Sequence, residues 1–330
     1  MTSHSDLQPH ATDLPRDASN TMTSPDYQFT VFTPTRNRAH TLHRVYDSLC
    51  AQTFRDFEWL IIDNGSTDGT TALVESWQRV ADFPIRYLFQ ENAGLHVSWS
   101  RGVAEASGRF LLGIRSADSF TPDALERFND IWRTIPEDER AGFSGASVNC
   151  VDENGQLIGT EFPEAVLDSD SSEIRHRYKV RGEKWGFHRV DVMRSFSLPV
   201  VEGYLGYVPE SILWREIGRH YKTRYVNERL RTYWQDQKRE SRMSVSAFRT
   251  RAMGGLLEAQ SILNEDLRWF RYDPLDFLRR SAKYSRASFD VGRSLGAQFR
   301  GLRNWGGRLL WAVTLPVGWL LHLFDRAGGG

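Results

Sequence analysis

The feature that most constrains the fold is a regular alternation of short apolar runs and helical patterns over residues 28–132. Apolar, β-rich runs occur at 28–33, 57–63, 85–89 and 109–114, and the segments between them carry apolar residues at helical spacing. Strands and helices that alternate with short connections are typical of a mostly parallel sheet covered by helices on both faces. The sequence therefore predicts an α/β fold.

Beyond residue 141 the pattern is mixed. It predicts strands at 145–151 and 156–162. A helical pattern returns over residues 243–270, where Gly254 and Gly255 are expected to break it.

Polar clusters follow the first, second and fourth predicted strands. They read PTRNR at 34–38, DNGS at 63–66 and RSAD at 115–118. In a parallel sheet, ligands bind beyond the carboxyl ends of the strands, so we expect these clusters to meet at one site. No G-x-G-x-x-G follows the first strand and no Walker-type G-x-x-x-x-G-K is present, which disfavours a dehydrogenase-type fold and a P-loop.

Charge and cysteine content narrow the classes of function. The 42 Lys and Arg residues balance 42 Asp and Glu residues, so the overall charge does not indicate nucleic-acid binding. Cys50 and Cys150 are too few for a disulfide framework or a zinc cage, which favours a reducing cytoplasm. Residues 1–26 are polar and aperiodic, which predicts a disordered tail without a signal peptide.

The charge balance breaks near the C-terminus. Between residues 271 and 308 nine basic residues face three acidic ones, and residues 309–324 then contain no Lys, Arg, Asp or Glu. As a helix this stretch would be about 24 Å long, short of the roughly 30 Å hydrocarbon core, and it contains Pro316 and Gly318. We therefore expect residues 271–324 to bind a membrane surface. The alternative is a helix that packs on the protein's own core or on a second subunit.

Three segments together resemble family 2 glycosyltransferases, which have the GT-A fold. They are FTVFTPTRNRAHTLHRVYDSLCAQTFRDFEWLIIDNGSTDGT, QENAGLHVSWSRGVAEASGRFLLGI and VEGYLGYVPESILWREIGRHYKTRYVNERLRTYW. The resemblance covers roughly residues 28–235, and its last part is similar to members that build bacterial surface polysaccharides.

The resemblance implies a division of the chain. A Rossmann-like GT-A domain would occupy residues 27–240, with a nucleotide-sugar half at 27–120 and an acceptor half at 121–240. A helical region with a basic, membrane-associating end would occupy residues 241–330.

The implied activity is transfer of a sugar, with inversion, from a nucleoside-diphosphate sugar to an acceptor hydroxyl in the synthesis of cell-surface polysaccharide or glycolipid. The acceptor would be a saccharide or lipid-linked, and the enzyme would be cytoplasmic and peripheral on the inner face of the cell membrane. Such a transfer needs a slot for the nucleotide and a carboxylate that accepts the hydroxyl proton. It also needs positive charge for the diphosphate, normally a divalent cation such as Mg²⁺ or Mn²⁺.

By resemblance, the nucleotide sugar is bound at the strand ends and at the start of the helix that follows the third strand. The residues are Pro34, Thr35, Arg36, Asn37, Arg38, Asp63, Asn64, Asn92, His96, Arg115, Ser116 and Ala117. Asp63 and Asn64 would contact the base, or else only hold a turn through side-chain-to-backbone bonds. Arg36 stands where the family usually has Tyr and would stack on the base or reach phosphate.

Asp118 is the central position of the expected site. Family members read Asp-x-Asp or Asp-x-Asp-Asp here, whereas this chain reads Arg115-Ser116-Ala117-Asp118. One carboxylate with diphosphate oxygens and water can hold Mg²⁺, so the resemblance implies that Asp118 is a metal ligand and a catalytic residue. Alternatively, Arg115 partly replaces the metal, or the chain is a non-catalytic nucleotide-sugar-binding scaffold.

Glu210 stands where similar proteins have the general base, or else only favours the start of a helix. Glu202 is the second candidate, and we place it near the acceptor together with Lys184, Trp185 and His188. An indole can stack on a sugar ring, although a half-buried core Trp is the alternative. A nucleotidyltransferase is disfavoured because no Gly-rich, Lys/Arg-bearing loop follows the first strand.

Overall fold

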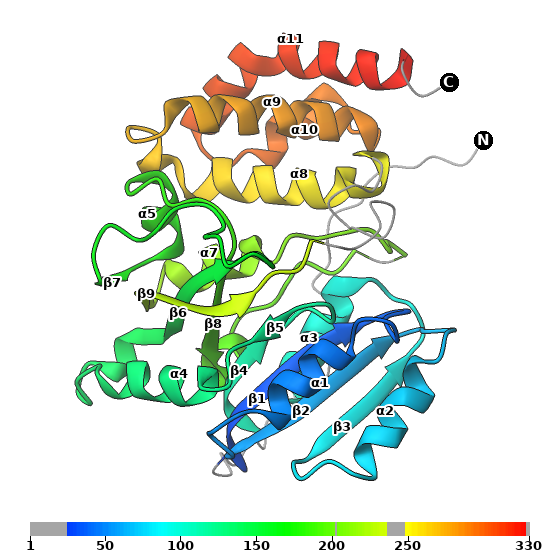
Figure 1. The fold of residues 1–330 in the computed structure, drawn as a ribbon. Coiled ribbons are helices and arrows are strands. Elements are labelled where there is room, and N and C mark those ends of the chain that lie inside the picture. The colour runs from blue at the N-terminus through cyan, green and yellow to red at the C-terminus, as the bar shows by residue number, and fades with distance from the viewer. Residues whose placement is uncertain (1–24, 202, 236–247, 328–330) are drawn as a thin grey trace, which may run out of the picture.

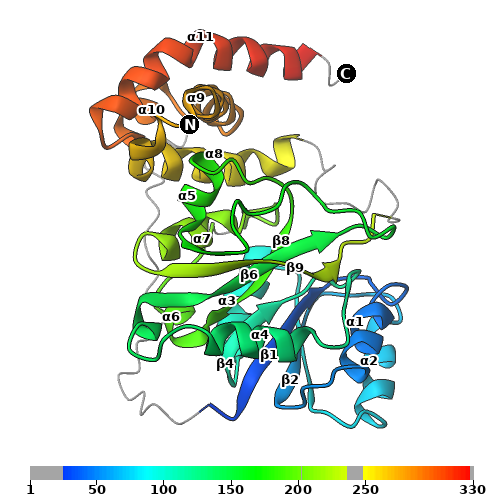
Figure 2. The same cartoon turned by 60° about the vertical axis from the view of Figure 1, so that its left-hand side comes forward.

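A computed structural model describes residues 25–201, 203–235 and 248–327 of the chain. Their strands form one nine-stranded sheet in the order β3-β2-β1-β4-β8-β6-β9-β5, with β7 paired to β9. Helices cover both faces of the sheet, and a separate helical layer lies beyond one edge (Figures 1 and 2). The predicted α/β class is confirmed. The predicted tail at 1–26 lies almost entirely outside the described residues.

The first four predicted strands are confirmed. They are β1 (Tyr27–Thr35), β2 (Phe57–Asn64), β3 (Ile85–Gln90) and β4 (Gly108–Gly113). The helices among and after them are α1 (His43–Cys50), α2 (Thr70–Gln78), α3 (Leu95–Glu105) and α4 (Ala124–Arg133). All three pairings among these strands are parallel, so their carboxyl ends share one edge of the sheet.

Alternate side chains of the strands enter two separate cores. Phe29 and Val31 of β1 join the core under α1, α2 and α4, whereas Phe32 joins the core on the other face. That second core is covered by α3, by α6 (Val190–Arg194) and by α7 (Ser211–Gly218). A strand places successive side chains on opposite faces, so runs that are apolar throughout make the buried centre of a three-layer fold.

The second half of the sheet is mixed rather than parallel. Its strands are β5 (Ser119–Phe120), β6 (Phe143–Val151), β7 (Val166–Ser169), β8 (Lys184–Arg189) and β9 (Lys222–Thr232). Short helices η1 (Arg140–Gly142) and α5 (Ser171–His176) accompany them. The strand predicted at 156–162 is wrong, because Leu157 makes only an isolated bridge to Val151. The prediction missed β9 because charged residues interrupt its apolar pattern.

The C-terminal region is a stack of helices. It contains α8 (Phe248–Glu265), η4 (Leu267–Trp269), α9 (Pro274–Asp290), α10 (Leu295–Gly301) and α11 (Trp305–Ala327), with α11 outermost (Figure 1). The predicted break at Gly254 is wrong, since α8 runs through it. A Cβ at Gly254 would lie 1.9 Å from the Tyr207 carbonyl oxygen, so this glycine permits close packing of α8 on the Tyr207 segment.

Helix α11 is longer than the sequence predicts, because it begins at Trp305 and continues through Pro316. It is the one helix among the described residues that is long and apolar enough to cross a membrane by length and composition alone.

Candidate functional site

The loops after β1 and β2 are joined to each other, as the polar clusters predict. Asn37, which has a positive φ of 54°, donates from its backbone N–H to Ser66 Oγ at 2.8 Å. Its side-chain Oδ1 accepts from the Thr67 backbone N–H at 2.8 Å. Arg36 is exposed beside it, and Pro34 pairs with Ile62 inside the sheet.

Asp63 and Asn64 hold the loops at the end of β2. The buried Asp63 carboxylate accepts from the Tyr87 hydroxyl at 2.5 Å and from the Ser66 backbone at 2.8 Å. Asn64 donates to Asn92 Oδ1 at 3.0 Å and accepts from the Ala93 backbone at 3.0 Å. These contacts are those of the turn alternative, so contact with a base remains a proposal.

Several of the expected nucleotide-sugar residues carry buried polar atoms without a hydrogen-bond partner in the described part of the chain. They are Thr35 Oγ1, both ring nitrogens of His96 and Arg115 Nη1. Burial lowers the pKa of His96, which keeps the ring neutral near pH 7. Because unpaired buried polar groups are costly, these atoms at one edge of the sheet offer donors and acceptors to a ligand.

Asp118 is fully buried, and its carboxylate binds the positively charged guanidinium of Arg231. Its Oδ2 accepts from Arg231 Nε at 3.0 Å and also from Arg231 Nη2. Its Oδ1 accepts from the Trp234 backbone N–H at 3.2 Å, and Arg115 Nη1 lies 3.8 Å from Oδ2.

The residues present do not fit the divalent cation that the resemblance implies. A hard cation takes several oxygen ligands, but both oxygens of Asp118 already face nitrogen donors of the protein. The Ala117 side chain has no ligand atom and its carbonyl oxygen accepts from Arg44, while the buried Ser116 is the only other oxygen-bearing side chain of residues 115–118. The prediction that Asp118 is a metal ligand is therefore corrected: Asp118 binds Arg231.

The end of β9 supplies residues that the sequence reasoning missed. The Arg115 guanidinium lies 4.0 Å from the centroid of the Tyr233 ring, and that of Arg44 lies 4.3 Å from the Trp234 ring. Arg44 also donates to the Ala117 carbonyl at 3.1 Å. Burial and the nearby charge of Arg115 lower the pKa of Arg38. The run of arginine and aromatic residues at 231–234 was the available signal.

Glu210 lies directly before α7 and is half-buried. The Tyr207 hydroxyl donates to its Oε2 at 2.7 Å. Burial raises the pKa of Glu210, although hydrogen bonds from Tyr207 and Trp99 oppose the shift. A carboxylate with a raised pKa is suited to general-base chemistry. Glu202, the second candidate, lies outside the described residues.

The acceptor role predicted for Trp185 is wrong. Trp185 is 2% exposed, packs against Phe120 and Phe128, and donates to the Gly113 carbonyl at 2.8 Å. Because β8 is paired on both sides, its alternate residues Trp185 and Phe187 point into the core.

His188 and Lys184 are also committed to contacts within the protein. His188 stacks on Trp214 with ring centroids 4.6 Å apart, and burial lowers its pKa to about 4. Lys184 Nζ donates to the Thr160 carbonyl at 2.8 Å. The structure therefore does not bring the predicted acceptor residues together at an open surface.

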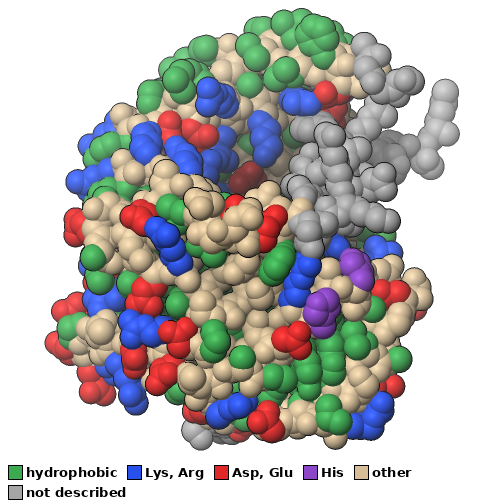
Figure 3. Space-filling model, in the orientation of Figure 1, with side chains coloured by type: hydrophobic (Ala, Val, Ile, Leu, Met, Phe, Trp, Pro, Cys, Tyr) green, Lys and Arg blue, Asp and Glu red, His purple; other side chains and the backbone are tan. Residues whose placement is uncertain are grey.

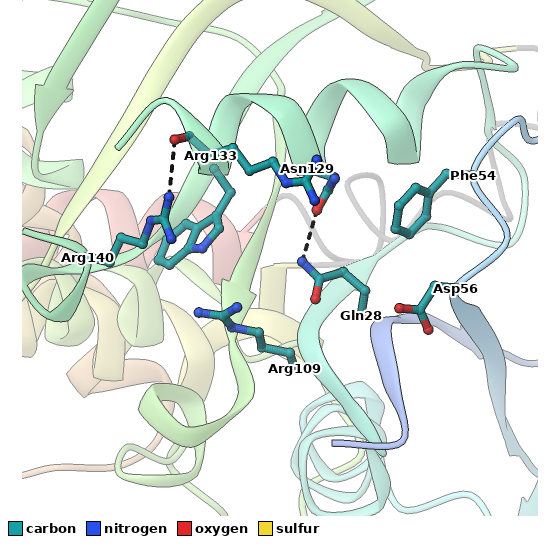
Figure 4. A pocket seen from close by; sticks show the side chains of 8 residues that line it. Gln28, Phe54, Asp56, Arg109, Asn129, Arg133 and Arg140 are labelled. Atoms are coloured by element: carbon teal, nitrogen blue, oxygen red, sulfur yellow. Dashed lines mark hydrogen bonds between the residues drawn. The ribbon is translucent and has the colours of Figure 1, made fainter. Parts of the chain in front are cut away.

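A cavity of about 350 Å³ lies away from this site (Figure 4). It is lined by Gln28, Phe54, Asp56, Arg109, Asn129, Trp132, Arg133 and Arg140. Gln28, Asp56 and Arg109 mark the amino-terminal ends of β1, β2 and β4, so the cavity is at the opposite edge of the sheet from the polar clusters.

One group of potential metal ligands joins α5 to α9. Ligand atoms of His176, Asp273 and Asp276 lie within 4.8 Å of one another. Asp273 pairs with Arg181 at 3.0 Å and Asp276 pairs with Arg280 at 2.7 Å. The arginines neutralise both carboxylates, and none of these residues follows a strand end of the candidate site.

Comparison with known proteins identifies a family. The sequence profile described as "Glycosyl transferase family 2" matches residues 30–197, about half of the chain. A similar curated protein is the Campylobacter jejuni "GalNAc(5)-diNAcBac-PP-undecaprenol beta-1,3-glucosyltransferase", which is 24% identical over 78% of this chain and 80% of its own length. An uncharacterized glycosyltransferase of Rickettsia felis is 30% identical over 46% of this chain and 26% of its own length.

Solved structures show the same fold. TarS of S. aureus superposes with a TM-score of 0.60 and 17% identity over 91% of this chain, which spans 53% of that TarS chain. A TarS fragment, residues 1–349, solved in complex with UDP-GlcNAc, gives a TM-score of 0.54 and 18% identity, with 88% of this chain and 80% of that chain covered. The predicted GT-A fold is thereby confirmed.

Proposed function

The chain belongs to glycosyl transferase family 2 and is a glycosyltransferase that uses a nucleotide sugar, and from this premise we propose that it transfers the sugar with inversion to a hydroxyl of a saccharide or lipid-linked acceptor. The likeness to a Campylobacter jejuni enzyme named for an undecaprenol-linked saccharide supports an acceptor of this kind. The relatives give no support to a non-catalytic scaffold. Cell-surface polysaccharide or glycolipid synthesis is the process that such an acceptor serves.

The observation that carries the proposal is the environment of Glu210. Inversion needs one carboxylate that accepts the hydroxyl proton while the oxygen attacks the sugar from the side opposite the diphosphate. Glu210 has a pKa raised by burial, and the Tyr207 hydroxyl holds its orientation from 2.7 Å. We assign it as the base. The strand-end residues around Thr35, His96 and Arg115 would bind the nucleotide sugar.

The division of labour proposed from the sequence is kept in its main lines, with residues 27–120 binding the donor and residues 121–240 contributing to the acceptor side, except that Arg231 of β9 lies with the donor residues at Asp118. No divalent cation takes part in the proposed steps, because the donor set at Asp118 does not fit one.

We further propose peripheral attachment to the inner face of the cell membrane through α11. Its inner face packs on α9, where Thr314 bonds to Ser281 at 2.8 Å and Asp325 pairs with Arg286 at 2.6 Å. Its outer face is a stripe of exposed apolar side chains: Trp305, Leu309, Val313, Val317, Leu320 and Phe324. Figure 3 shows hydrophobic side chains along this outer edge with Lys and Arg side chains beneath them. An apolar face bordered by basic groups suits an anionic lipid surface.

Incubation of the purified protein with a panel of labelled nucleotide sugars and undecaprenyl-diphosphate-linked saccharides tests the activity. We expect one donor to give a product whose anomeric configuration, determined by NMR, is opposite to that of the donor. Glu210→Gln should slow product formation by about 10²-fold or more, and the matched exposed control Glu75→Gln should not. Retained configuration, or full activity of Glu210→Gln, would overturn the proposal.

A further inference from the structure

Guanidinium groups gather around Asp118, which follows β4 in the candidate site. Arg231 is buried and its charge is held against Asp118, while Arg115 stands 3.8 Å from the same carboxylate oxygen. Burial lowers the pKa of Arg231, but the charge and hydrogen bonds of Asp118, together with other nearby groups, raise it overall, so the guanidinium stays charged. Arg38 is close enough to Arg115 to be affected by its charge. Two guanidinium groups therefore face one carboxylate, and a third lies within range of the Arg115 charge.

An aromatic residue directly after β9 contacts two of these guanidinium groups. The Tyr233 ring contacts both, with its centroid 4.0 Å from the Arg115 guanidinium and 5.5 Å from that of Arg231. Arg115 Nη1 is buried and has no hydrogen-bond partner in the described residues. A planar guanidinium held this way presents paired N–H donors that match phosphate oxygens.

We propose that Arg115 and Arg231 do the work of a divalent cation, neutralising the nucleoside diphosphate as it leaves. The inference rests on the proposed function. In the step, the bond between the anomeric carbon and the diphosphate oxygen breaks, and its electron pair stays on the diphosphate beside the two guanidinium groups. The acceptor oxygen forms the new bond to the anomeric carbon, and its proton passes to Glu210. Asp118 is a positioning residue that holds Arg231, and the transfer needs no added metal.

The direct test is calorimetric titration of the full chain with UDP and with GDP, in excess EDTA and in excess Mn²⁺. We expect the nucleoside diphosphate that binds to do so with the same Kd, within about twofold, in both conditions, and transfer to proceed in EDTA. Arg115→Met should weaken binding in EDTA at least tenfold, and Arg115→Lys should recover part of the loss. Arg79→Met, an exposed arginine at the end of α2, is the matched control and should change nothing.

The outcomes separate the inference from the proposed function. If EDTA abolishes binding and transfer and Mn²⁺ restores both, the proposed transfer stands and the metal-free inference is overturned. If Arg115→Met remains folded by its Tm and binds as well as the wild type in EDTA, the inference also fails. If no nucleoside diphosphate binds and no donor is consumed in either condition, both the proposed function and the inference fail.

Discussion

The Asp118 carboxylate and the Arg231 guanidinium form a buried ion pair that ties the loop after β4 to the end of β9. The two strands are far apart in the chain, and the pair is 0% exposed on the Asp118 side and 6% on the Arg231 side. Tyr233, two residues after Arg231, lies against Arg115 on the other side of this link.

Replacing Asp118 by Ala should destabilise the protein markedly. Arg231 would keep its charge without a partner in a buried site, which costs about 3–5 kcal/mol of unfolding free energy. Denaturant unfolding of Asp118→Ala measures the loss. Asp82→Ala, which breaks the exposed pair with Arg55, is the control and should cost less than about 1 kcal/mol. Equal losses in the two variants would contradict a buried structural pair.

Replacing Glu210 by Gln should lower kcat while raising stability. Loss of a general base lowers the rate by about 10²–10⁴-fold. Because burial raises the pKa of Glu210, its favourable contribution to folding is complete at low pH and is lost as pH rises through the folded-state pKa. The amide removes that ionisation, so Glu210→Gln should have a higher Tm than the wild type at pH 8 and a similar Tm at pH 4. A lower Tm at pH 8 would be inconsistent with a buried carboxylate of raised pKa.

Replacing Tyr207 by Phe should move the pH profile of activity. The Tyr207 hydroxyl bonds to the ionised carboxylate and so opposes the raised pKa of Glu210. Without it, the pKa should rise further, and the acid limb of kcat/KM should shift to higher pH while activity on the alkaline side is largely kept. An unchanged acid limb would mean that Glu210 does not control it.

The sequence predicted the parallel half of the sheet better than the mixed half. Runs such as 57–63 are apolar throughout because β2 is buried on both faces, and the turn residues after them mark the strand ends. Strand β9 was missed because Arg224, Glu228 and Arg231 interrupt its pattern. These charges pair with Asp168, Arg127 and Asp118, which lie 56, 101 and 113 residues away in the chain.

The contacts of residues 115–118 could be predicted from the sequence only in part. The cluster at 115–118 was placed at the correct sheet edge by β4 alone, but the partner of Asp118 comes from β9. Trp185 was placed at the acceptor because residue type alone does not distinguish a sugar platform from a core side chain. Its burial depends on the antiparallel pairing of β8 with β4 and β6, which no local pattern in the sequence specifies.

Replacing Gly254 by Ala should disturb the catalytic segment, whereas the same change at Gly255 should not. A methyl group at Gly254 would lie 1.9 Å from the Tyr207 carbonyl oxygen, so α8 and the segment leading to Glu210 must move apart. A methyl group at Gly255 would lie 3.1 Å from Lys283 Cε, and the flexible Lys283 side chain can move away from it. Replacing Gly by Ala inside a helix also stabilises the helix by about 0.5–1 kcal/mol. Measurement of kcat and Tm for both variants checks this. Equal behaviour of the two would contradict close packing of α8 on Tyr207.

Charged residues on the outer face of α11 should release the protein from lipid. Val313 and Leu320 are 64% and 53% exposed, so Val313→Asp and Leu320→Asp leave the packing on α9 intact. Each removes a side chain whose insertion contributes about 1.5–3 kcal/mol, so partitioning onto phosphatidylglycerol vesicles should fall at least tenfold. Binding should weaken with added salt, because the basic residues around the stripe act through screened charge.

Vesicle flotation measures both effects, and Val80→Asp, on the 74% exposed Val80 after α2, is the control. If the α11 variants still float with vesicles and instead convert a dimer to a monomer in light scattering, the outer face of α11 is an interface between copies of the chain.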